Sequence, residues 1–174
     1  MQEILQIFIN STEGMTRNLP EYAWPISAVI AWIIFFLLVD WSRLRYTIWG
    51  GVFASALQIL VDDAAMKMNL YQVKTLISVL GSSVFFTFGV VFAIGVLFAQ
   101  SLPVSRWLQV FNILVVVALF SVEEYLYVKI GVLKYLNWNH PASIFIDLLV
   151  FTSFTWLVEA LGLNQAGCVG RGGL

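Results

Sequence analysis

Two pairs of adjacent acidic residues, Asp62-Asp63 and Glu123-Glu124, interrupt long apolar stretches of the sequence. Asp147 lies within a further apolar stretch, and His140, the only histidine, precedes that stretch in a polar loop. A charged side chain at the centre of a membrane helix costs about 2.5–3.5 kcal/mol on insertion scales, so acidic residues there are candidates for function. Six residues are therefore candidates for binding a ligand or ion: Asp62, Asp63, Glu123, Glu124, His140 and Asp147.

These residue types suit three kinds of chemistry. Carboxylates bind hard cations such as Mg²⁺ or Ca²⁺, which take about six to eight oxygen ligands or complete their shell with water. A buried carboxylate can carry a proton in coupled transport. A protonated carboxyl in an apolar pocket can act as an acid on an apolar substrate. The residue types do not distinguish among these three chemistries, and the sequence does not identify a cofactor. A zinc site is not expected, because one histidine and the distant Cys168 supply too few ligands.

The acidic pairs have a plainer interpretation, in which they mark where a helix leaves the hydrocarbon. Successive residues of a helix point about 100° apart, so at most one residue of each pair is expected to face the bundle centre. Lys67 follows Asp63 by four residues, which is the ordinary spacing of a surface ion pair.

The composition is that of an integral membrane protein. The 174 residues are 60% hydrophobic and 11% charged, with a mean hydropathy of +0.89, whereas soluble domains carry about 25% charged residues. The net charge of −1 gives no reason to expect a nucleic-acid partner. The single cysteine excludes an intramolecular disulfide.

A bilayer core needs about 20 apolar residues in a helix, and the apolar runs are continuous rather than the alternating strands of a barrel. We predict an all-α bundle of five transmembrane helices, preceded by a short interfacial helix in residues 1–20 and followed by a flexible Gly-rich tail, 164–174. The bundle is one domain, 21–163, with spans at 22–39, 46–66, 76–99, 107–128 and 142–162.

The predicted topology brings the acids together. Spans 46–66 and 107–128 run in the same direction, and each has roughly 16 apolar residues, about 24 Å of helix, before its acidic pair. Span 142–162 starts from the same membrane face, with Asp147 about two turns in. The sequence therefore predicts a carboxylate-lined site between these three helices, near one face.

Other residues predict how the bundle meets the membrane. We expect Glu159 near the opposite face, either snorkelling or pairing with an arginine there. Arg43 and Arg45, beside the first span, favour an amino end outside and a carboxyl end in the cytoplasm of a cell membrane. Four tryptophans fall at predicted interfaces as an aromatic belt: Trp24, Trp41, Trp107 and Trp138. Small residues four apart, which let helices approach closely, occur at Gly51/Ser55, Gly89/Ala93 and Gly95/Ala99.

Parts of the sequence resemble known families. The segment from Val39 to Arg43 (VDWSR), the acid that ends the second span, and Glu123 through Gly131 to Leu136-Asn137-Trp138 are similar to an uncharacterised family of small multi-pass membrane proteins of endospore-forming bacteria, over residues 25–160. Where that family has Gly-Glu-Pro, this chain has Val122-Glu123-Glu124. The resemblance implies the topology and no activity. Residues 122–127 also resemble a motif of membrane-embedded lycopene cyclases, without its proline, which implies acid catalysis by Glu123 and Glu124.

Three functions follow as expectations. The first is binding or transport of a small solute or cation at the carboxylate cluster. The second is a non-catalytic accessory or scaffold subunit, and the third is a carotenoid-cyclase-like acid catalyst. An enzymatic function is less favoured than a non-enzymatic one. The expected partners are the lipid bilayer and further copies of the chain or a larger membrane complex.

Overall fold

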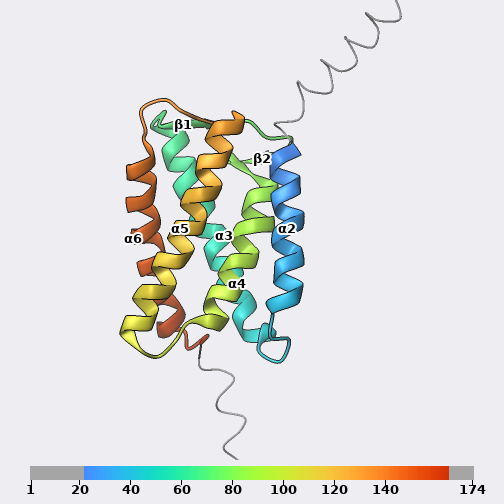
Figure 1. Ribbon diagram of the computed structural model, residues 1–174, viewed down its shortest axis with the longest axis vertical. Coiled ribbons are helices and arrows are strands. Elements are labelled where there is room, and N and C mark those ends of the chain that lie inside the picture. Colours follow the sequence, from blue (N-terminus) through green and yellow to red (C-terminus); the bar gives the residue numbers. More distant parts are fainter. Residues whose placement is uncertain (1–21, 165–174) are drawn as a thin grey trace, which may run out of the picture.

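The computed structural model describes residues 22–164, which form a bundle of roughly parallel and antiparallel helices (Figure 1). Helices α3 and α5 run upward in Figure 1, and α2, α4 and α6 run downward, so α3 and α5 end where α6 begins. We call this the upper end of the bundle. The helices are α2 (Ala23–Leu38), α3 (Leu44–Lys67), the π-helix η2 (Phe86–Val91) continuing into α4 (Phe92–Ser101), α5 (Arg106–Ile130) and α6 (His140–Ala160). The predicted helix in residues 1–20 and the tail from 165 onward lie outside the described residues.

Two of the described helices, α3 and α6, are long and apolar enough to cross a membrane. Helix α2 and the segment Phe86–Ser101 are apolar but shorter. Large apolar side chains point outward on these helices, for example Leu37 at 77% exposure and Trp156 at 70%. An outward apolar surface is what contact with lipid tails requires, because such a patch in water would promote association.

Four short strands at the upper end correct the expectation of a purely helical chain. Strand β1 (Tyr71–Val73) follows α3, and β4 (Leu133–Tyr135) follows α5. The two pair antiparallel, with Tyr71 opposite Tyr135. This pairing ties together the chain segments that leave α3 and α5, where the acidic pairs lie.

The predicted span 76–99 begins too early. Strands β2 (Ser78–Val79) and β3 (Ser82–Ser83) form a hairpin, and the helical segment follows it. Leu80 and Gly81 connect the strands with φ angles of 48° and 85°, as the favoured two-residue hairpin turn requires. Hydropathy could not separate this apolar hairpin from the helix that follows, whereas Gly81-Ser82-Ser83 is a turn signal.

Local residue choices fix the ends of α5 and α6. Gly131 ends α5 with a φ of 86°, in the left-handed region that glycine adopts freely. The side chain of Asn139 caps α6 by accepting a hydrogen bond of 2.9 Å from the Ala142 amide. Glu123 and Glu124 therefore lie in the last two turns of α5, and His140 is the first residue of α6.

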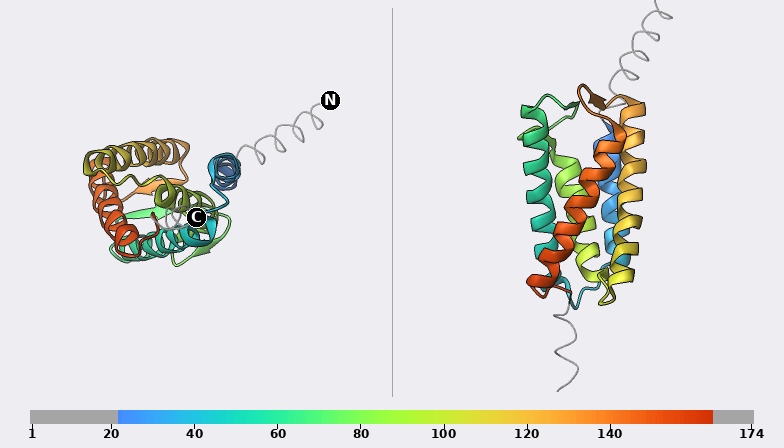
Figure 2. Two further views of the ribbon diagram at one scale, coloured as in Figure 1. Left: turned by 90° about the horizontal axis from the view of Figure 1, so that it is seen from below. Right: turned by 90° about the vertical axis from the view of Figure 1, so that its left-hand side faces the viewer.

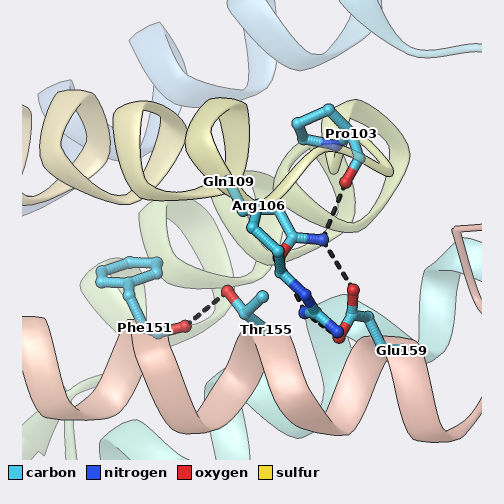
Figure 3. A network of polar contacts seen from close by, with 6 residues as sticks. All are labelled: Pro103, Arg106, Gln109, Phe151, Thr155 and Glu159. Atoms are coloured by element: carbon cyan, nitrogen blue, oxygen red, sulfur yellow. Dashed lines mark hydrogen bonds and ion pairs between the residues drawn. The ribbon is translucent and has the colours of Figure 1, made fainter.

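At the lower end, polar side chains join α5 to α6, as Figure 3 shows. Arg106 lies 2.6 Å from Oε2 of Glu159, and the amide of Gln109 donates to Oε1 of Glu159 at 2.6 Å and to the Pro103 carbonyl at 2.8 Å. The expected pairing of Glu159 with an arginine is therefore present. Glu159 belongs to a helix junction, far along α6 from the other acids.

Helices α3 and α4 pack with their backbones in close contact. A Cβ atom added at Gly51 would lie 2.7 Å from Cγ2 of Val96 and 2.8 Å from the Phe92 carbonyl oxygen. Gly50 and Gly95 are equally crowded across the same contact. Small residues here do what their spacing predicts, because they let two helix backbones approach.

We expect Gly51→Val to lower the free energy of unfolding by about 1–3 kcal/mol, because the new side chain overpacks this contact. Thermal unfolding in detergent, followed by tryptophan fluorescence, measures the change. Ala56→Val on the exposed face of the same helix is the matched control. Equal melting temperatures for the two variants would show that close α3–α4 contact is not required.

Candidate functional site

The upper half of the bundle contains a cavity of about 130 Å³ between α3, α5 and α6. Helix α6 slants across the bundle between α3 and α5 (right view of Figure 2), and its side chains between Ser143 and Phe154 contribute to the lining. Most of the lining is aliphatic or aromatic. The polar side chains in the lining are Gln58, Asp62, Tyr71, Ser83, Glu123, Glu124, Tyr127, Ser143 and Asp147.

Four of the six predicted site residues line this one cavity: Asp62 from α3, Glu123 and Glu124 from α5, and Asp147 from α6. Among the described residues, no lysine, arginine or histidine lines it. The four carboxylates therefore face a shared space without a basic side chain in its wall.

Asp62 is 5% exposed, and its hydrogen bonds go to a single oxygen. The Gln58 amide donates to Oδ1 at 2.9 Å and the Tyr71 hydroxyl donates to the same atom. Within residues 22–164, no group donates to Oδ2. Burial and then the charge of Asp62, with smaller effects of Glu124 and Asp147, raise the pKa of Tyr71 well above its ordinary value. The phenol therefore keeps its proton and remains a donor.

Glu123 faces the side of the cavity toward α2. The Tyr127 hydroxyl lies 2.5 Å from Oε1 of Glu123 and 2.6 Å from Oγ of Ser27 in α2. Tyr127 also packs against Trp24, with ring centroids 4.1 Å apart. Glu123 is thereby joined to the helix that begins the described chain.

Glu124 faces α6. Its Oε1 accepts a hydrogen bond of 2.5 Å from Ser143, whose Oγ in turn accepts one of 2.7 Å from the Trp138 indole. Its Oε2 is buried with no hydrogen-bond partner in the described chain and lies 3.3 Å from Nδ1 of His140. Burial and the charge of Glu124 raise the pKa of Tyr135, which lies beside this group.

His140 contacts the site without lining it. Its Nδ1 faces Glu124, and its Nε2 lies 2.8 Å from Oγ of Ser121 on α5. The imidazole thus contacts Glu124 but is not itself part of the cavity wall. The prediction that His140 binds a ligand is not supported by this position, although its place beside an acid of the cluster is as expected.

Asp63 lies outside the cavity, and its Oδ2 is 2.6 Å from the exposed ammonium of Lys67. This residue fits the plainer interpretation of a helix-end ion pair. The 100° turn between neighbours places Asp62 inside and Asp63 outside, as expected. The same argument was wrong for Glu123 and Glu124, because the stripe of α5 that lines the cavity (Phe120, Glu123, Glu124 and Tyr127) is wide enough to include both neighbours.

Asp147 has the least support of the four. Within residues 22–164 it receives no hydrogen bond. Its carboxyl group is largely buried, and the neighbouring charge is that of Glu124. A carboxylate held in an apolar wall without a donor is costly unless a proton or a cation neutralises it.

Several lining residues escaped the sequence analysis. Trp24 was expected in an interfacial belt, but it is 3% exposed and its indole donates to the Lys74 carbonyl at 2.6 Å. Tyr127 follows Glu123 by four residues, a spacing that could have identified it. Tyr71 reaches Asp62 from strand β1, which pairs with β4. The hydrophobic pattern of the sequence does not predict this contact.

The carboxylates do not form a ready metal centre. Among residues 22–164, no three His, Cys, Asp or Glu side chains come together closely enough to hold a metal ion. The acids are spread around the wall of the cavity and do not converge on one point.

Comparison with protein-family models, with curated proteins and with solved structures finds no match to this chain. The resemblances to the endospore-former family and to lycopene cyclases therefore stay predictions, and function rests on the geometry.

We expect Tyr71→Phe to lower the free energy of unfolding by about 1–3 kcal/mol, because Asp62 loses a buried donor. Tyr125→Phe, which removes a hydroxyl from an exposed ring, is the control. Thermal unfolding of both variants in detergent measures the effect. A Tyr71→Phe protein that melts with the parent would mean that this hydrogen bond contributes no net stability.

Proposed function

We propose that this chain is a multi-pass membrane protein that binds a small solute or cation in the upper cavity. Helices α3 and α6 have the length and apolar composition of membrane spans. Helices α2 and α5 stand beside them and also present large apolar side chains outward, and Phe88 does so in η2, which continues into the largely buried α4; this arrangement supports five crossings. Basic residues lie at both ends of the described chain, with Arg43, Arg45 and Arg106 at the lower end and four lysines (Lys67, Lys74, Lys129 and Lys134) at the upper end, so the positive-inside rule does not assign the orientation.

The observation that carries the proposal is the unbalanced charge of the cavity wall. Four carboxylates from three helices line one space, and none of the described lining residues is basic. Ionised groups in such surroundings need a counter-charge, since Coulombic repulsion and loss of hydration both act against them. A bound cation or proton supplies it.

The position of the acids also bears on the alternatives. A scaffold in which acids only mark helix ends would turn Asp62 and Glu123 toward lipid headgroups, whereas both line the same cavity. An acid catalyst acting on a carotenoid-like substrate would use the same groups, but it requires turnover as well as binding. Binding is the simpler function that the geometry supports.

Thermal unfolding of the purified protein in detergent, scanned over pH, Na⁺, K⁺, Mg²⁺, Ca²⁺ and small organic solutes, tests the proposal. We expect at least one of these to raise the melting temperature of the parent. Asp62→Asn and Glu124→Gln should abolish the shift, because each removes a charge from the cavity wall. Asp63→Asn should preserve it, because Asp63 points to Lys67 outside the cavity.

A melting temperature that is unchanged across the whole panel would contradict the proposal and favour a scaffold. So would a shift that survives in both cavity variants, because the ligand would then bind elsewhere on the protein.

A further inference from the structure

The size of the cavity limits the body of the ligand. An apolar cavity of about 150 Å³ in another protein holds benzene, and the space here is about 130 Å³. Its inner wall is apolar, with Phe120 from α5 and Leu57, Phe151 and Phe154 from α3 and α6. A ligand enclosed here therefore has an apolar part no larger than about one ring.

The hydrogen-bonding groups of the wall limit the polar part of the ligand. Tyr71 and Gln58 donate to Asp62, and Ser143 donates to Glu124. The indoles of Trp24 and Trp138 donate to a backbone carbonyl and to Ser143. These donors are engaged with the protein, so they do not offer a ready site for a carboxylate, a phosphate or a sugar hydroxyl.

The groups that remain open are acceptors. Oδ2 of Asp62 and the carboxylate of Asp147 receive no hydrogen bond from residues 22–164, and both residues line the cavity. Asp62 is also more than nine-tenths buried. A ligand that pairs with these groups must donate hydrogen bonds and carry positive charge.

A bare metal ion would balance the negative charge of the wall, but the carboxylates are not arranged to coordinate it. Mg²⁺ and Ca²⁺ need oxygens that converge at about 2.0–2.6 Å on one point, whereas the described acids form no such group. A primary ammonium has three N–H donors, no acceptor and a body that can fill the apolar wall. Aromatic side chains around it add attraction for a cation.

We infer that the cavity takes a primary ammonium ion that carries an apolar body of about one ring. This inference rests on the proposed function, since it names the class of ligand for the same cavity. The ammonium lies between Asp62 and Asp147, and the body lies against Phe120 and Phe151.

Benzylammonium and benzyl alcohol make a matched pair of test ligands, because they differ only in the ammonium and the hydroxyl. We expect benzylammonium to raise the melting temperature in detergent at neutral pH, and benzyl alcohol at the same concentration to leave it unchanged. Titration calorimetry gives the dissociation constant independently of protein stability. Asp62→Asn and Asp147→Asn should each weaken benzylammonium binding at least about tenfold, which is about 1.4 kcal/mol, while Asp63→Asn should bind like the parent.

The possible outcomes distinguish a failure of the ammonium inference from a failure of the proposed function. Equal binding of benzyl alcohol, or a shift with Mg²⁺ or Ca²⁺ and none with benzylammonium, would overturn the ammonium inference and leave a solute- or cation-binding cavity. Benzylammonium binding that both cavity variants retain would overturn the inference as well, because the ion would lie elsewhere. No response to protons, metal ions, the amine or the alcohol would overturn both.

Discussion

The pairing of β1 with β4 is the interaction on which the upper half of the molecule depends. It joins the segments that leave α3 and α5, and the Leu70 carbonyl extends it by accepting from the amides of Leu136 and Asn137. Because Tyr71 lies in β1, this pairing brings its hydroxyl to Asp62. The chain between β4 and α6 then starts from a fixed place, so α6 can present Ser143 and Asp147 to the same cavity.

The buried carboxylates are stabilised by hydrogen bonds to some of their oxygens, while the other oxygens have no donor within the described part of the protein. Asp62, Glu123 and Glu124 each have a hydroxyl beside one oxygen, and the three hydroxyls come from β1, α5 and α6. Such bonds reduce the cost of burying a carboxylate without cancelling its charge. The remaining acceptors belong to residues that line the cavity, and the second oxygen of Glu124 lies 3.3 Å from His140. This division separates groups that hold the wall together from groups that can meet a ligand.

The sequence predicted the helices and the common level of the acids, because apolar run length and helix direction are local or additive properties. Helix phase also separated Asp62 from Asp63. It failed for Glu123 and Glu124, because the stripe of α5 that lines the cavity is wide enough to include two neighbouring residues. The hairpin at Leu80-Gly81 was hidden within an apolar run, and Trp24 was assigned to an interface. Trp24 reaches Lys74 across 50 residues of chain, and Tyr71 reaches Asp62 from a strand beyond the end of α3, so neither contact follows from helix periodicity.

Close packing in the lower half of the bundle stabilises the fold below the cavity. Below the cavity, Phe98 and Val158 are almost fully buried, and the α3–α4 contact at Gly51 leaves no space for a Cβ atom. Dense packing there holds the helices together at the lower end, and the β1–β4 pairing joins the segments that leave α3 and α5 at the upper end. A ligand that binds the folded cavity and not the unfolded chain stabilises the fold, so binding and stability are coupled at this site.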